Sequence, residues 1–141
     1  MWWRNGRCLP ALSSNERNDV EAILTNIREG MITEILDRYQ RLGSHERHAL
    51  VLAYDYTKDK LELEYGDFAT WRDDDKTDVA HKLMQVAEEF MAEDPDWACG
   101  AGLLGLYVEA QTLPTGEARE MVLRIEDWYQ NAIETEFGRL P

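Results

Sequence analysis

The segment from Asp75 to Pro95 reads DKTDVAHKLMQVAEEFMAEDP, and its pattern is the main basis for predicting the fold. Its apolar residues form two adjacent ridges whose members recur every three or four positions, as they do on one side of a helix. The ridges consist of Val79, Leu83, Val86 and Phe90, and of Ala80, Met84, Ala87 and Met91. The opposite side is polar and largely acidic. We therefore expect an amphipathic helix that covers a core and exposes carboxylates.

Helical periodicity also precedes this segment. Ser13 and Glu16 have the spacing of a capping box, which predicts a helix start. The apolar pattern then continues to residue 42 through Gly30. Because glycine weakens a helix interior, we expect a kink or break at Gly30.

A nearly apolar helix follows the central segment. Asp94 and Pro95 are suited to the N-cap and first position of a helix over about residues 95–112. A helix that is apolar on all sides is buried, and Ala98, Gly102 and Gly105 would let a neighbouring backbone approach closely. A last amphipathic pattern predicts a helix over residues 118–137.

The segment 44–65 fits two structures. Ala49, Leu52, Ala53 and Tyr56 would share one side of a helix that begins near Ser44. The strict alternation over residues 61–65 is instead typical of a half-buried strand. A helix and a small β-hairpin within residues 49–65 both remain open. In either case, we expect Phe68 and Trp71 to pack a short turn onto the core.

These patterns predict a mainly α protein, a compact bundle of four to six helices joined by short turns. Residues 1–12, with Gly6 and Pro10, predict an irregular N-terminal tail, and residues 13–141 a single helical domain.

The charge narrows the classes of partner. The 141-residue chain carries a net charge of −13, which argues against direct binding to nucleic acid or to an anionic membrane. Cys8 and Cys99 share no short motif, so we expect reduced thiols and a cytoplasmic protein. No stretch has the length of an export signal or a membrane span.

The sequence predicts no catalytic residue, metal ligand or cofactor. His45 and His48 are spaced too closely for the zinc-protease motif, and Met84 stands where a calcium loop starting at Asp73 needs glutamate. Residues 47–54 resemble the first helix of region 4 in sigma factors. The following segment is acidic and lacks a basic recognition helix, so the resemblance implies no function here.

Acidic residues are concentrated in the middle of the chain, where residues 55–96 contain fourteen acids and five bases. We expect them to form a partner-binding surface with Trp71 as an aromatic anchor. The predicted surface comprises Glu62, Glu64, Asp67, Trp71, Asp73, Asp74, Asp75, Asp78, Glu88, Glu89 and Glu93. Carboxylates on a rigid frame can imitate nucleic acid, so the leading hypothesis is a non-enzymatic protein that binds a basic partner, such as a nucleic-acid-binding protein, as an inhibitor.

Two alternatives remain. Glu89 and Glu93, with acids such as Glu109 or Glu126, could hold Mg²⁺ in a phosphohydrolase-like enzyme. Alternatively, the apolar helix 95–112 could pack against a second copy in a structural homo-oligomer.

Overall fold

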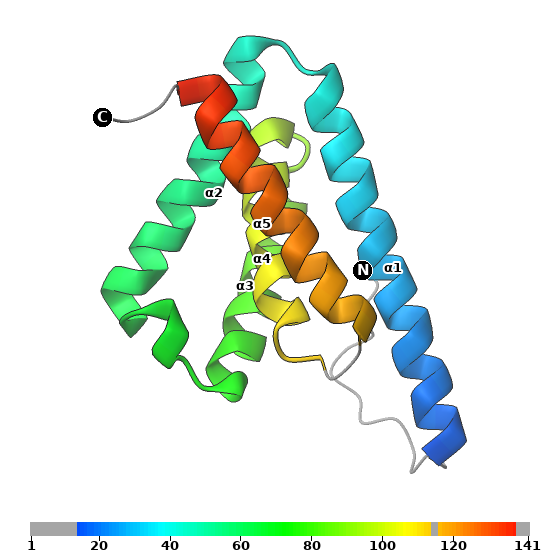
Figure 1. The fold of residues 1–141 in the computed structure, drawn as a ribbon. Coiled ribbons are helices and arrows are strands. Elements are labelled where there is room, and N and C mark those ends of the chain that lie inside the picture. The colour runs from blue at the N-terminus through cyan, green and yellow to red at the C-terminus, as the bar shows by residue number, and fades with distance from the viewer. Residues whose placement is uncertain (1–13, 114–115, 138–141) are drawn as a thin grey trace.

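The structure, a computed structural model, describes residues 14–113 and 116–137. In these ranges the chain forms α-helices and one 3₁₀ helix, and no strand. The elements are α1 (Ser14–Arg41), α2 (Ser44–Tyr65), η1 (Phe68–Thr70), α3 (Asp73–Phe90), α4 (Pro95–Ala110) and α5 (Gly116–Phe137). The prediction of a mainly α bundle is confirmed (Figure 1). The predicted tail and the Ser13 cap lie outside the described residues.

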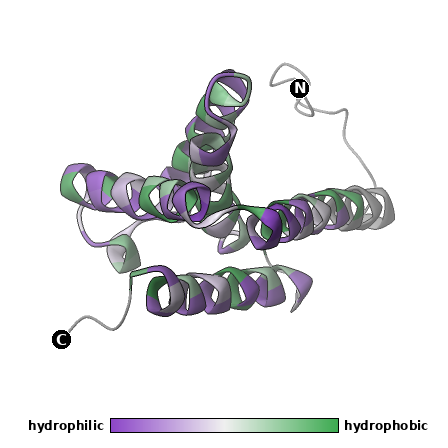
Figure 2. Cartoon of the chain, turned by 90° about the horizontal axis from the view of Figure 1, so that it is seen from above, coloured by the Kyte–Doolittle hydropathy of each residue, from purple (hydrophilic) through white to green (hydrophobic). Residues whose placement is uncertain are grey.

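Helix α4 is the centre of the bundle. It packs against α3 and α2 over most of its length and also contacts α5 and α1 (Figure 1). Most of its residues are buried, as the apolar sequence predicts. Hydrophilic and hydrophobic residues alternate along the peripheral helices (Figure 2). The chain's own helices thus cover the apolar surface that could have made α4 an interface between copies.

Glycines set the closeness of the α4 contacts. Gly102 and Gly105 face α3, where a Cβ on Gly105 would lie 3.2 Å from Leu83 Cβ. Gly100 faces α2, where a Cβ would collide with the Leu50 carbonyl oxygen and lie 2.8 Å from Ala53 Cβ. Gly102 and Gly105 thus allow a neighbouring helix to approach closely, as predicted. The tightest contact, however, is at Gly100, which the sequence did not single out.

Helix α3 matches its predicted amphipathic pattern except at both ends. Val79, Ala80, Leu83, Met84 and Ala87 are buried. The helix begins at Asp73, so Asp73, Asp74 and Asp75 occupy its first turn and Arg72 is the N-cap residue. Asp75 therefore lies inside the first turn and is not the N-cap residue that its place at the start of the apolar pattern suggests. Its charge still lies where the helix dipole favours a carboxylate.

The C-terminal end of α3 comes earlier than the pattern suggests. Phe90 is the last helical residue, and Phe90 and Met91 are 42% and 45% exposed, so they do not extend the buried ridges. Phe90 packs edge-on against Trp97 instead, with ring centroids 5.7 Å apart. Asp94 accepts a hydrogen bond from the Trp97 amide and precedes Pro95, which confirms the predicted start of α4.

The segment 44–65 is one continuous helix, so the hairpin alternative is wrong. The alternating leucines explain the outcome: Leu61 packs against the core, whereas Leu63 is 89% exposed. A strand would have placed both leucines on one face. Of the four residues expected on one side of this helix, Ala53 is buried and Ala49 is half-buried, whereas Leu52 and Tyr56 point outward. Leu50, Val51 and Tyr54 complete the buried face.

Helix α1 runs without interruption through Gly30, so the expected break is wrong. Apart from its chain neighbours and the adjacent backbone of α1 itself, nothing lies within 4 Å of where a Cβ on Gly30 would be. Ion pairs join α1 to α4, from Arg28 to Glu109 and from Arg38 to Asp96. These charges help to hold α1 against the bundle.

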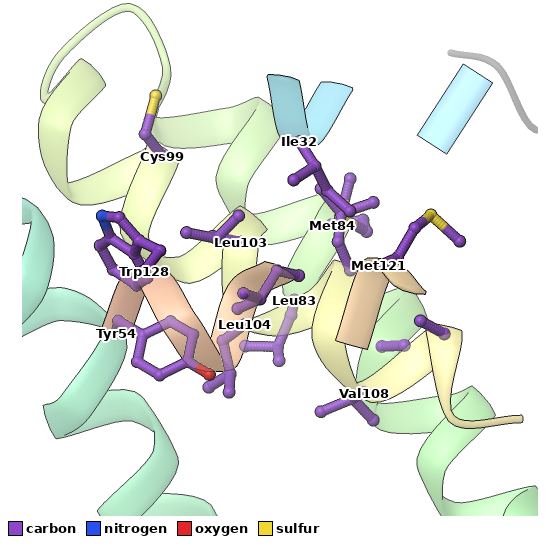
Figure 3. Close-up of a cluster of buried hydrophobic side chains, with 14 of the residues drawn as sticks. Ile32, Tyr54, Leu83, Met84, Cys99, Leu103, Leu104, Val108, Met121 and Trp128 are labelled. Atoms are coloured by element: carbon purple, nitrogen blue, oxygen red, sulfur yellow. The ribbon is translucent and has the colours of Figure 1, made fainter. Parts of the chain in front are cut away.

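Buried side chains from every α-helix meet at the centre (Figure 3). Leu103, Leu104 and Val108 come from α4 and lie among Ile32, Tyr54, Leu83, Met84, Met121 and Trp128. Trp128 of α5 packs edge-on against both Tyr39 and Tyr54, at 5.6 and 5.4 Å between ring centroids. Such aromatic contacts add to the burial of apolar area.

Candidate interaction surface

Most of the predicted acidic surface lies around the corner that joins α2 to α3 (Figure 1). Three of its acids belong to the end of α2 and the turn after it, and four to the first turns of α3. All are exposed except Glu62, which is half-buried: Glu62, Glu64, Asp67, Asp73, Asp74, Asp75 and Asp78. Glu62 and Asp67 also fix the corner, because they accept hydrogen bonds from the amides of Phe68 and Ala69.

A second acidic group is separate from this corner. Glu88, Glu89 and Glu93 are exposed at the other end of α3 and in the turn after it. Ten or more helical residues separate them from Asp78, which corresponds to about 15 Å along the helix axis. The predicted acids therefore form two groups, one at each end of α3.

Trp71 lacks the exposure that its predicted role as an aromatic anchor requires. Its side chain is only 8% exposed, and its indole Nε1 donates to the Gly66 carbonyl oxygen at 2.9 Å. Its ring packs against Phe68 and Tyr65. The expectation that Trp71 and Phe68 pack a turn onto the core is confirmed, and this packing withdraws the indole from any partner.

The structure shows exposed apolar residues that the sequence interpretation had placed inward. Leu52, Tyr56 and Leu63 of α2 are 53%, 62% and 89% exposed. They share a helix face that points away from the core. The signal in the sequence was the presence of two apolar faces on one helix, but the sequence did not show which face is buried.

A cleft of about 380 Å³ lies between α1, the start of α2 and α5. On its wall the Glu136 carboxylate accepts hydrogen bonds from Tyr39 and Arg47, at 3.5 and 3.3 Å. Arg47 also donates to the carbonyl oxygens of Tyr39 and Gln40 at the end of α1, and His48 Nε2 lies 2.7 Å from the Glu136 carbonyl oxygen. These contacts join the end of α5 to the α1–α2 turn, which is a structural role.

A second cleft of about 320 Å³ lies beside α2 and α5 and is lined by Tyr54, Tyr107 and Tyr129. Burial and then a hydrogen bond to Glu126 raise the pKa of Tyr107 to about 12. Burial also raises the pKa values of Tyr54 and Tyr129, and hydrogen bonding to Asp55 adds to the effect at Tyr129. The phenols therefore stay protonated at neutral pH.

These shifts predict alkaline destabilisation. An unfolded tyrosine ionises near pH 10, whereas the folded protein retains these protons, so unfolding is favoured as pH rises above about 10. For buried Tyr54 the slope approaches about 1.4 kcal/mol per pH unit. Thermal unfolding between pH 8 and 12 should therefore be less pH-dependent in Tyr54→Phe. Exposed Tyr56→Phe is the control, and equal profiles for Tyr54→Phe and the unaltered protein would contradict the prediction.

Metal binding, a reactive thiol and a membrane span are the other features that could indicate a function. Within the described ranges, no group of three or more His, Cys, Asp or Glu side chains is placed to hold a metal ion. Cys99 is a buried free thiol whose pKa is raised by burial, which disfavours the reactive thiolate. None of the helices described here has the length and apolar character needed to cross a membrane.

Comparison with known proteins gives no family model, curated protein or solved structure that matches the chain.

Proposed function

We propose that the protein is a small acidic interaction protein that binds a basic partner protein and competes with nucleic acid for it. The observation that supports this proposal most strongly is the exposure of the acids around the α2–α3 corner, on a frame fixed by hydrogen bonds and by buried Trp71. Clustered carboxylates attract a cationic surface and raise its association rate.

The charge distribution within the bundle is consistent with this role. The ion pairs among described residues use Glu109, Asp96 and Glu136 at helix–helix contacts. The acids of the corner, apart from half-buried Glu62, are instead exposed to solvent. A partner can bind the acids of the corner without breaking these interhelical ion pairs. Binding there therefore leaves the fold intact.

The two alternative functions find less support. Glu89 and Glu93 are exposed rather than gathered around a cavity, and Glu109 is engaged with Arg28. The apolar residues of α4 lie inside the bundle and offer no surface to a second copy.

Capture from a lysate of the native host tests the proposal. Proteins that bind the immobilised chain should be basic, should elute as salt rises from about 50 to 200 mM, and should be displaced by duplex DNA. Mass spectrometry identifies them, and each is then purified and retested alone. Partners that are neutral or acidic, or that resist both salt and DNA, would contradict the proposal.

A further inference from the structure

The outer face of α2 carries an apolar stripe. Leu52, Tyr56 and Leu63 fall within about 40° of each other around the helix and extend over about 16 Å of its axis. They lie opposite the buried residues of the same helix, and α2 forms one edge of the molecule (Figure 1). Exposed apolar residues that gather on one face mark interaction sites more often than scattered ones do.

The stripe has the spacing of a coiled-coil seam. Positions 52, 56, 59 and 63 are separated by four, three and four residues, and the third of them is Asp59, which is exposed. A charged residue within an apolar seam sets the register and selects a partner of opposite charge. Half-buried Asp55 and Glu62 flank the seam on one side, at one helical turn from Asp59, and exposed Lys60 flanks it on the other, so the charged groups around the seam are mostly acidic.

We propose that this face of α2 docks an amphipathic helix of the basic partner, and this inference rests on the proposed function. The partner helix would place apolar residues against Leu52, Tyr56 and Leu63 and a lysine or arginine against Asp59. Charge complementarity selects this occupant over a second copy, because another chain of net charge −13 would be repelled. The seam ends at Leu63, and Glu64 and Asp67 of the corner follow it directly in the chain.

Synthetic peptides provide the probe. One helical peptide combines leucines at four- and three-residue spacing with flanking lysines, and its control has the same lysines but glutamine in place of leucine. We expect the leucine peptide to bind at least about tenfold more tightly by calorimetry. In heteronuclear NMR spectra it should shift the signals of residues 52–63. Equal affinities, no binding, or shifts confined to other helices would overturn the assignment.

Matched variants distinguish binding at this surface from non-specific hydrophobic binding. Leu52→Ser with Leu63→Ser should weaken binding of the leucine peptide about tenfold or more. Leu123→Ser, which alters a leucine of α5 that is 50% exposed, against 53% for Leu52, should not. Asp59→Lys should also weaken binding, whereas thermal unfolding should change little because these side chains are exposed. Equal losses for the α2 and α5 variants would overturn the inference.

The two proposals can fail separately. If purified partners bind with salt dependence but ignore the α2 variants, the docking face is wrong and the proposed function stands. If neither the peptides nor the captured proteins bind with salt dependence, both are overturned.

Discussion

Gly100→Ala is expected to lower the free energy of unfolding by about 3 kcal/mol or more, despite the better helix propensity of alanine. The added Cβ would collide with the Leu50 carbonyl oxygen and crowd Ala53, so α2 and α4 would have to separate. Backbone cannot rotate aside as a flexible side chain does. Denaturant unfolding followed by circular dichroism measures the change.

Gly30→Ala is the matched control for this substitution. Gly30 is also a helix-interior glycine, but a Cβ added there would meet nothing within 4 Å outside the adjacent backbone of its own helix. Its replacement should raise the free energy of unfolding by up to about 1 kcal/mol, through helix propensity alone. A Gly100→Ala protein as stable as the unaltered protein would show that α2 and α4 are not packed as described.

Glu109→Gln is expected to cost about 3 to 5 kcal/mol, because it removes the charge of one partner in a buried ion pair. The Arg28 and Glu109 side chains are 5% and 13% exposed. The guanidinium would lose the carboxylate that it faces across the α1–α4 contact. Urea unfolding midpoints at neutral pH provide the measurement.

The pair between Arg38 and Asp96 provides the comparison. Arg38 is 39% exposed, so solvent screens this pair and Asp96→Asn should cost about 1 kcal/mol or less. Equal costs for the two substitutions would contradict the burial of the Arg28–Glu109 pair. A larger cost for Asp96→Asn would contradict it as well.

The sequence predicted those elements in which one apolar face or one cap determines the structure. The ridge around Leu83 and the Asp94–Pro95 start of α4 are local signals, and both are confirmed in their main features. Helix α2 was harder because its two apolar faces, with Leu50 and Leu52 as members, are equally suited to burial. Only the packing of α4 against α2 distinguishes them.

Two further differences arise from tertiary contacts. Trp71 suits both an interface and a core, and the hydrogen bond to the Gly66 carbonyl oxygen holds it inside. Gly100 is one of several glycines in α4, and its proximity to the Leu50 backbone depends on where α2 crosses. The negative charge was evident from composition, whereas its separation into two groups follows from the length of α3.

The affinity of a purified basic partner for matched charge variants, measured at about 50 and 200 mM salt, tests the central claim most directly. Three triple variants each remove three exposed negative charges, so they share one net charge. The first alters the corner, the second the far end of α3, and the third α5: E64Q/D74N/D78N, E88Q/E89Q/E93Q and E120Q/D127N/E134Q.

We expect affinity to fall as salt rises, and we expect the corner variant to bind most weakly and to depend least on salt. The affinity of the α5 variant should remain close to that of the unaltered protein. The affinity of E88Q/E89Q/E93Q shows whether the acids at the far end of α3 contribute to binding. Affinity that ignores salt, or an equal loss in the corner and α5 variants, would contradict a binding role for the corner.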